Sequence, residues 1–201
     1  MSAVKAVKSG EWSTWKPLWM CGHGLAGATV GIVGLGRIGF GVAQRLRPFA
    51  VSRVLYTGHK EKSYAVDIAA EFVSLNELLA NADFVIASCP LSDETKNLFS
   101  ASTFSRMKRT AIFINTSRGG IVNQPDLYEA LKTGVIAAAG LDVTTPEPLP
   151  VSDALLTLDN CVVLPHIGSA TVETRTAMSV LTARNILSAL CDKPMPSPLH
   201  V

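Results

Sequence analysis

Short apolar runs alternate with helix-like segments along most of this chain. From residue 28 onward the runs are ATVGIVG, SRVLYTG, DFVIASC, AIFINTS, IAAAGLDV and CVVLP. They are apolar at consecutive positions, which is typical of strands in a parallel sheet that is buried on both faces. The segments between them are long enough to form crossover helices, so the alternation predicts a doubly wound α/β fold, a Rossmann-like parallel sheet.

Capping residues support the helices expected between these strands. Ser74, followed by Glu77, forms a plausible capping box in front of LNELLANA. Asn123 can cap the helix PDLYEALKTG, which has Pro125 in its first turn and Gly134 at its end. A last helix is expected over roughly residues 169–191. Its apolar residues form a face that is expected to be packed: Met178, Leu181, Ile186, Leu187 and Leu190.

Composition excludes several classes of protein. The 201 residues are 48% hydrophobic and 17% charged, as in an ordinary globular domain, and the net charge of +2 comes from mixed acids and bases. No basic stripe suits nucleic acid, no apolar stretch is long enough to cross a membrane, and MSAVKAVKSGEW lacks the apolar core of a signal peptide. Cys21, Cys89, Cys161 and Cys191 are widely scattered, which predicts reduced thiols in a cytoplasmic protein without a metal site or disulfides.

The segment GIVGLGRIGFG carries a GxGxxG motif made of Gly34, Gly36 and Gly39. In a dinucleotide-binding turn the first glycine allows the tight bend, the second lets the backbone approach a pyrophosphate, and the third lets helix and strand pack closely. The motif follows the first expected strand and opens a helix, which favours this interpretation over a purely structural turn. Gly39 and Gly41 would weaken that helix, so we expect a close approach at both.

The end of the second expected strand bears on the choice of dinucleotide. NAD-binding folds place an acidic residue there to hold the ribose 2′-hydroxyl. This chain has Thr57 and Gly58 at that position, followed by His59 and Lys60. A small residue followed by cations suits a 2′-phosphate, so the sequence favours NADPH, and NADH stays possible because lysine lacks arginine's bidentate fork. The alternative is that these charges form only a solvated loop.

Three polar residues follow later strands and could serve a hydride-transfer reaction. Arg118 follows AIFINTS and precedes two glycines that are expected to keep its surroundings uncrowded, Glu147 stands between two prolines, and His166 follows CVVLP. Arg118 could hold a substrate carboxylate, and a carboxylate such as Glu147 would favour the imidazolium form of His166. We expect His166 to protonate the keto oxygen as a general acid. Alone, a histidine at a strand end is more often structural.

Motifs over nearly the whole chain resemble those of the D-isomer-specific 2-hydroxyacid dehydrogenases. They are GIVGLGRIG, INTSRGGIVNQPDLYEAL, GLDVTTPEPLP and LPHIGSAT, and WKPLWMCGHGL, LYTG and PMPSPL resemble members that reduce glyoxylate and hydroxypyruvate. The resemblance implies catalytic roles for Arg118, Glu147 and His166 and an NADPH-dependent reduction of a small 2-keto acid. The cofactor contacts that it implies, beside the glycines, are Leu35, Gly36, Arg37, Ile38, Gly58, His59, Lys60, Pro90, Thr116 and Asp142, with Gly168 nearby.

The same resemblance implies a domain organisation and a homodimer. Residues 1–24 would be a linker and dimerisation arm, 25–170 the dinucleotide-binding domain, and 171–201 a helix and tail that pack on a second, substrate-binding lobe. That lobe is built mostly from about a hundred preceding residues, so we expect it to be largely absent here and catalysis to be weakened. Trp12, Trp15 and Trp19 would anchor the arm on the partner or pack on the chain's own core.

Two alternatives to an enzyme stay open. The arginine, glutamate and histidine also resemble those of the C-terminal-binding-protein corepressors, which would make the chain a dinucleotide-controlled binding module. Alternatively, the chain is a catalytically incompetent partner, such as a truncated isoform, that only dimerises with a longer subunit. The exact substrate also stays open among glyoxylate, hydroxypyruvate and other small 2-keto acids.

Overall fold

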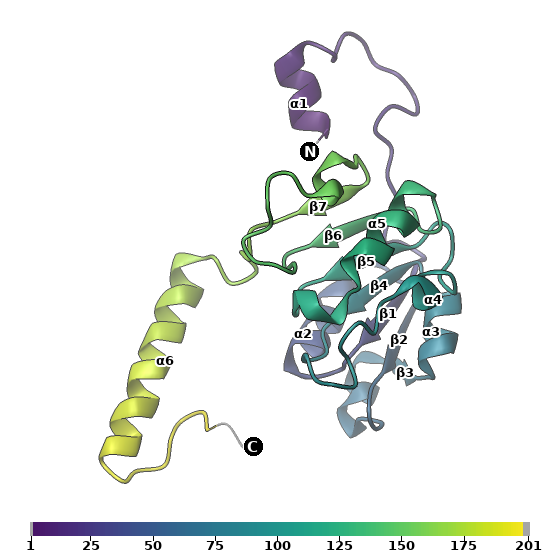
Figure 1. Ribbon diagram of the computed structural model, residues 1–201. Coiled ribbons are helices and arrows are strands. Elements are labelled where there is room, and N and C mark those ends of the chain that lie inside the picture. The colour runs from purple at the N-terminus through teal and green to yellow at the C-terminus, as the bar shows by residue number, and fades with distance from the viewer. Residues whose placement is uncertain (1, 199–201) are drawn as a thin grey trace. The chain divides into compact units, whose positions relative to one another are not determined.

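The computed structural model describes residues 2–198, which form two compact units divided between Pro165 and His166. The first unit is built on a seven-stranded parallel sheet with the order β3-β2-β1-β4-β5-β6-β7 (Figure 1). The strands are β1 Thr29–Val33, β2 Arg53–Thr57, β3 Ala70–Phe72, β4 Phe84–Ala87, β5 Ile112–Asn115, β6 Ala138–Leu141 and β7 Cys161–Val163. The chain reverses its direction of winding between β1 and β4, which confirms the doubly wound prediction.

Six of these strands lie within the apolar runs of the sequence, and β3 is an addition. It pairs with β2 at the edge of the sheet and holds the residues Ala-Glu-Phe. Three residues with a central glutamate make no apolar run. The segment is therefore recognised as a strand from its pairing with β2, because its own sequence carries no strand pattern.

The helices begin where the capping residues predict. Ser74 Oγ accepts a hydrogen bond from the Glu77 N–H, and Asn123 Oδ1 accepts one from the Asp126 N–H. The helices are α1 Ser2–Ser9, α2 Arg37–Leu46, α3 Leu75–Asn81, α4 Ala101–Phe104, α5 Gln124–Lys132 and α6 Val172–Leu190. Short 3-10 turns are η1 Arg47–Phe49, η2 Ser63–Ile68, η3 Gly119–Ile121 and η4 Ala154–Thr157.

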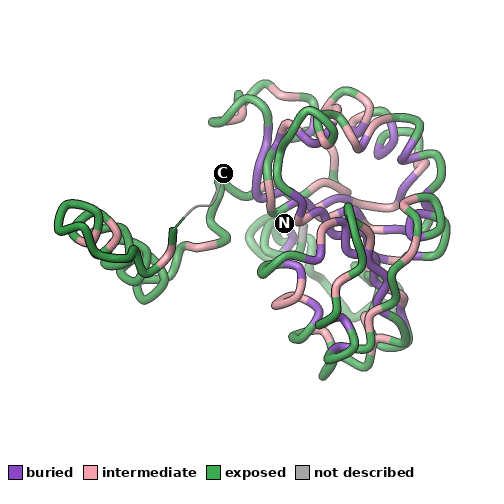
Figure 2. Tube along the Cα trace, turned by 90° about the horizontal axis from the view of Figure 1, so that it is seen from below, coloured by how far each residue is buried: buried purple, intermediate pink, exposed green. Residues whose placement is uncertain are grey.

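Successive strand residues point to opposite faces of the sheet, and each face has its own core. On one face α3, α4 and α5 pack against a cluster that includes Val85 and Phe113. On the other, α2 and η2 pack against a cluster that includes Ile32 and Ile86. Buried residues, drawn in purple in Figure 2, therefore make up nearly all of the central strands β1 and β4, whereas the edge strands β3 and β7 hold none. Because both faces are covered, the strands read as continuous apolar runs.

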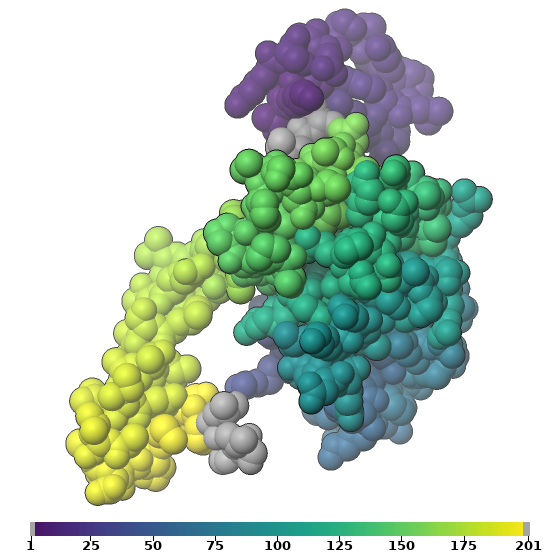
Figure 3. All heavy atoms as spheres, viewed as in Figure 1, coloured from purple at the N-terminus to yellow at the C-terminus, as the bar shows by residue number. Residues whose placement is uncertain are grey.

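The second unit consists mainly of α6, whose expected packing on a substrate-binding lobe stays a prediction. None of the residues of α6 is buried, and the apolar side chains expected to pack, such as Met178 and Leu187, are exposed. The atoms of this helix are drawn in yellow-green to yellow in Figure 3. Among the residues described, no helix is both long and apolar enough to cross a membrane.

The tryptophans near the N-terminus are not packed in a hydrophobic core either. Trp12 and Trp15 are exposed, and only Trp19 is partly covered. For Trp12 and Trp15 the structure thus rules out packing on the chain's own core. Their role as anchors on a partner stays a prediction.

Candidate functional site

A cavity of about 350 Å³ opens at the carboxyl ends of β2, β1 and β4. It lies where the strand order reverses, the place where open α/β sheets bind their ligands. Its wall is built from residues that directly follow these strands: Gly34, Leu35 and Gly36 after β1, Gly58 and His59 after β2, and Pro90 after β4. Six of the residues predicted from the sequence are therefore brought together here.

Two glycines of the motif are required by close backbone packing. Gly34 has a φ of +97°, and a Cβ there would lie 2.7 Å from the backbone nitrogen of Cys89. A Cβ at Gly39 would overlap the Gly34 carbonyl oxygen and the Ser88 hydroxyl. Both positions match their predicted roles of tight turn and close helix–strand contact. At Gly41 the nearest atom is the flexible end of Arg45, 3.3 Å away, so the close approach expected there is wrong.

Gly36 differs from both because no atom lies within 4 Å of where its Cβ would be. It is the N-cap of α2 and has an extended backbone, with no side chain capping the helix. The first N–H groups of a helix have no partner within it, and they carry the positive end of the helix dipole. Open space in front of such a terminus fits a pyrophosphate, with Arg37 and Ile38 in the first turn.

Three hydroxyl groups, none of them predicted from the sequence, hold the loops around the cavity. The Tyr64 hydroxyl donates to the Leu35 carbonyl oxygen at 2.7 Å, and the Ser88 hydroxyl donates to that of Gly34 at 2.6 Å. The Tyr56 hydroxyl accepts from the Lys62 N–H at 2.8 Å and so fixes the loop after β2. The contacts of Tyr64 and Ser88 join distant parts of the chain, so no local sequence pattern could have indicated them.

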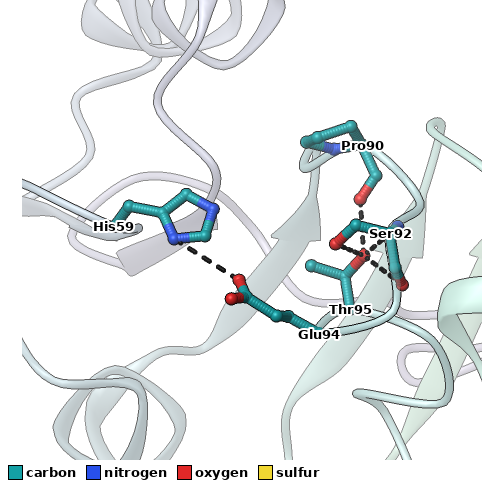
Figure 4. Close-up of polar contacts among 5 residues, drawn as sticks. All are labelled: His59, Pro90, Ser92, Glu94 and Thr95. Carbon is teal, nitrogen blue, oxygen red and sulfur yellow. Dashed lines mark hydrogen bonds and ion pairs between the residues drawn. The ribbon is translucent and has the colours of Figure 1, made fainter.

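Charges of both signs stand at the mouth of the cavity. His59 and Lys62 line it from the loop after β2, and Glu94 lines it from the loop after β4. His59 Nδ1 lies 3.6 Å from Glu94 Oε2, with the imidazole and the carboxylate facing each other (Figure 4). Lys60 is exposed and does not line the cavity. Glu94 was not predicted from the sequence.

The apolar part of the wall includes Cys89. Its side chain is buried, and this burial raises the pKa of the thiol. A thiol with a raised pKa is a poor nucleophile near neutral pH. Cys89 therefore contributes shape to the cavity and no reactive group.

Arg118 lies outside this cavity, three residues after the end of β5. The side chain of Asn115 shapes its loop: Oδ1 accepts from the Ser117 N–H at 3.0 Å, and Nδ2 donates to the Arg118 carbonyl oxygen at 2.9 Å. Asn115 is fully buried, whereas Arg118 and Thr116 are exposed. Asn115 was not predicted from the sequence, although an asparagine within the apolar run AIFINTS could have indicated this role.

The loop of Arg118 packs directly on the loop that carries Glu147. A Cβ at Gly119 would overlap the Thr144 carbonyl group, so the close approach of the two loops requires this glycine, while the side chain of Arg118 itself stays exposed. The Thr144 N–H in turn donates to Glu147 Oε1 at 3.0 Å. The first unit thus places these two loops in contact after neighbouring strands, with Asp142 buried just beyond β6.

His166 and Gly168 belong to the second unit, which begins at His166. His166 follows the end of β7 by three residues and has a φ of +53°. A non-glycine residue with such a φ is uncommon and is found more often at functional sites than elsewhere. No group of three or more metal-ligating side chains is found among residues 2–198.

Comparison with known proteins agrees with this architecture. Residues 1–168 match the family model described as D-isomer specific 2-hydroxyacid dehydrogenase, NAD binding domain. The glyoxylate reductase/hydroxypyruvate reductase of Mus musculus is 59% identical over 200 residues, which are 99% of this chain and 61% of that protein. The chain therefore spans about three fifths of the length of this relative.

Solved structures show the same fold. The TT0316 protein from Thermus thermophilus has a TM-score of 0.92 and 41% identity, over 99% of this chain and 62% of its own. An acyclic imino acid reductase in complex with NADPH and D-Arg has a TM-score of 0.85 and 26% identity, over 98% of this chain and 62% of its own. The shared region is thus the parallel-sheet unit with its following helix.

Proposed function

The chain belongs to the D-isomer specific 2-hydroxyacid dehydrogenase family, and from this membership we propose that it forms the NADPH-binding part of a reductase for glyoxylate or hydroxypyruvate. The mouse relative is named for both substrates, and its similarity extends over 99% of this chain. The chain spans 61% of this relative. The activity, the substrate and a homodimeric state of the whole protein are therefore part of the proposal.

The observation that carries the proposal is the contrast among the three motif glycines. Gly34 and Gly39 are required by packing within the protein, whereas the space in front of Gly36 is open. A purely structural glycine turn would need its glycines for internal contacts alone. An open position at the uncapped N-terminus of α2 instead suits the approach of an anionic ligand.

The residues around the cavity fit a nicotinamide dinucleotide. Gly34 to Ile38 would hold its pyrophosphate, and Gly58 to Lys60 together with Pro90 would face its adenosine end. Thr116, Asp142 and Gly168 would lie toward its nicotinamide end. When bound, the dinucleotide supplies the hydride for the keto carbon.

The remaining proposed roles belong to Arg118, Glu147 and His166. The exposed guanidinium of Arg118 would bind the substrate carboxylate and orient the keto group. His166 would donate a proton to the keto oxygen, and Glu147 would position its imidazole. The supporting observations are that β5, β6 and β7 are consecutive in the sheet and that each of the three residues follows one of them.

The test follows NADPH oxidation by the purified chain, through the nicotinamide absorbance, with hydroxypyruvate or glyoxylate. We expect His166→Ala to lower kcat by about 100-fold or more, the usual contribution of a general acid. NADPH affinity should stay the same, because the imidazole acts on the substrate.

Two outcomes would contradict the proposal in different ways. Turnover that survives His166→Ala would exclude His166 as the proton donor. No NADPH binding by the folded wild-type chain would exclude the dinucleotide function, whereas NADPH binding without turnover would leave that function intact and assign catalysis to a longer protein.

A further inference from the structure

The end of β2 lacks the acidic residue that would select NADH, yet a carboxylate still enters this end of the cavity. Thr57 and Gly58 occupy the strand end, and Glu94 reaches the same wall from the loop after β4. Its Oε2 atom lies 3.6 Å from His59 Nδ1. The fold therefore brings the carboxylate of Glu94 close to the end of β2, although the sequence of that strand end contains no acidic residue.

The loop that carries Glu94 is held in shape by its neighbour Thr95. The Thr95 hydroxyl donates to the Pro90 carbonyl oxygen at 2.7 Å and accepts from the Ser92 N–H at 2.8 Å (Figure 4). Both Pro90 and Thr95 also line the cavity. The Glu94 backbone is thus fixed relative to the cavity wall, although its side chain is largely exposed.

The charge of Glu94 acts differently on the two dinucleotides. NADPH carries a 2′-phosphate with a charge near −2, and NADH carries a neutral hydroxyl at the same position. A nearby carboxylate repels the phosphate, whereas it can accept a hydrogen bond from the hydroxyl. Glu94 also lies 3.6 Å from His59, one of the side chains that a 2′-phosphate would use.

We propose that Glu94 is a specificity-determining residue that reduces the preference of this site for NADPH over NADH. The inference rests on the proposed dinucleotide function and deepens it. Cations of the loop after β2 favour the 2′-phosphate, and Glu94 opposes them from across the cavity. Selectivity therefore depends on two loops that lie about 35 residues apart in the sequence, from His59 to Glu94.

The test measures binding by calorimetry on the whole chain, with NADPH and NADH. A second pair of ligands, adenosine 2′,5′-bisphosphate and AMP, isolates the 2′-phosphate. The variants are Glu94→Gln and, as a control, Glu129→Gln, which removes the same charge from an exposed pair with Lys132 on α5. Thermal melts confirm that both variants are folded.

We expect Glu94→Gln to tighten NADPH about threefold to tenfold, because it removes one repelling unit charge from a solvated site, and to leave NADH within about twofold. The bisphosphate should follow NADPH, and AMP should follow NADH. Added salt should reduce the gain, and Glu129→Gln should change neither affinity.

An unchanged or lowered ratio of NADPH to NADH affinity in Glu94→Gln would overturn the inference while leaving the dinucleotide function intact. Equal gains in Glu129→Gln would overturn it too, since net charge would then explain the effect. If the folded wild-type chain binds none of the four ligands, the proposed function fails together with the inference.

Discussion

At the scale of single residues, the site is organised by groups that never face a ligand. Gly39 and Gly119 bring backbone segments into contact, and hydroxyls such as Tyr64 fix the loops around the cavity. Asn115 does the same for the loop of Arg118 through hydrogen bonds to two residues. Removing the Tyr64 hydroxyl or the Asn115 amide leaves the backbone groups that they bond without a hydrogen-bond partner.

Asn115→Ala tests this role of a buried amide. It should lower the free energy of unfolding by about 1–3 kcal/mol, the usual cost of leaving buried hydrogen-bond partners unsatisfied. It should also raise KM for the keto acid, because the loop of Arg118 loses its support. Urea unfolding and steady-state kinetics measure the two effects.

The matched control for Asn115 is Asn81→Ala, at the exposed end of α3. Its side chain donates to the Glu77 carbonyl oxygen, so it removes the same amide from a solvated position. We expect a change below about 0.5 kcal/mol, as for most surface substitutions. Equal losses in the two variants would show that burial of Asn115 is unimportant.

Glu94 shows why residues of the site escaped prediction from the sequence. GxGxxG and the cationic strand end are local patterns, so Gly34, Gly36 and His59 could be assigned to the cavity in advance. Glu94 reaches the cavity because the sheet order brings β4 beside β1. A residue whose role depends on such non-local packing has no local signature.

At the scale of elements, the amino end of the sheet is held by an aspartate. Asp83 precedes β4, and its carboxylate accepts from the Thr29 N–H and from Lys108 Nζ, both at 2.8 Å. Burial alone would raise the pKa of Asp83. The bonds from Lys108 and Thr29 and the charges of Lys108 and His23 outweigh burial and lower this pKa below its usual value.

This pKa shift predicts an acid-dependent contribution to stability. A carboxyl whose pKa is lower in the folded state stabilises the fold above its unfolded pKa of about 3.9, and the contribution is lost as the pH falls through the folded value. Asp83→Asn should therefore destabilise the protein at pH 7 and match wild type in strong acid. Because the Asp83 side chain is 34% exposed, we expect about 1 kcal/mol or less.

Urea unfolding at about pH 7 and about pH 3 measures this dependence. Asp159→Asn, at an exposed position, serves as the control for removing one charge. A deficit for Asp83→Asn that is as large in acid as at neutral pH would contradict the electrostatic explanation.

The elements that could be predicted were those with their own apolar pattern or cap. Six strands and the caps at Ser74 and Asn123 are of this kind, because buried parallel strands and helix starts leave local marks in the sequence. The strand β3 has neither mark. The apolar stripe of α6 shows which face of this helix is apolar, but a periodic pattern does not identify what packs on that face.

At the scale of the whole molecule, the core on one face of the sheet determines which thiols can react, because Cys89 and Cys161 both pack in it. Cys89 is buried and Cys161 is partly buried, whereas Cys21 and Cys191 are exposed. Burial, with a smaller contribution from the charge of Asp153, raises the pKa of Cys161 to about 11. The fold should therefore protect two of the four thiols.

Reaction with an aromatic disulfide reagent at about pH 8 tests this protection, since the reactive species is the thiolate. Two thiols should react rapidly in the folded chain, and all four should react in denaturant. Cys21→Ser and Cys191→Ser should each remove one rapid equivalent. Rapid reaction of a third thiol in the folded chain would contradict the packing described for the sheet.

The central claim is that the turn after β1 is a dinucleotide cradle, and the NADPH affinity of Gly36→Ala tests it most directly. Gly36 has a φ of −86° and open space around its Cβ position, so alanine should leave the melting temperature unchanged. It should weaken NADPH binding at least about tenfold by filling the space in front of α2. Wild-type affinity in Gly36→Ala, or no NADPH binding by the folded wild-type chain, would contradict the account.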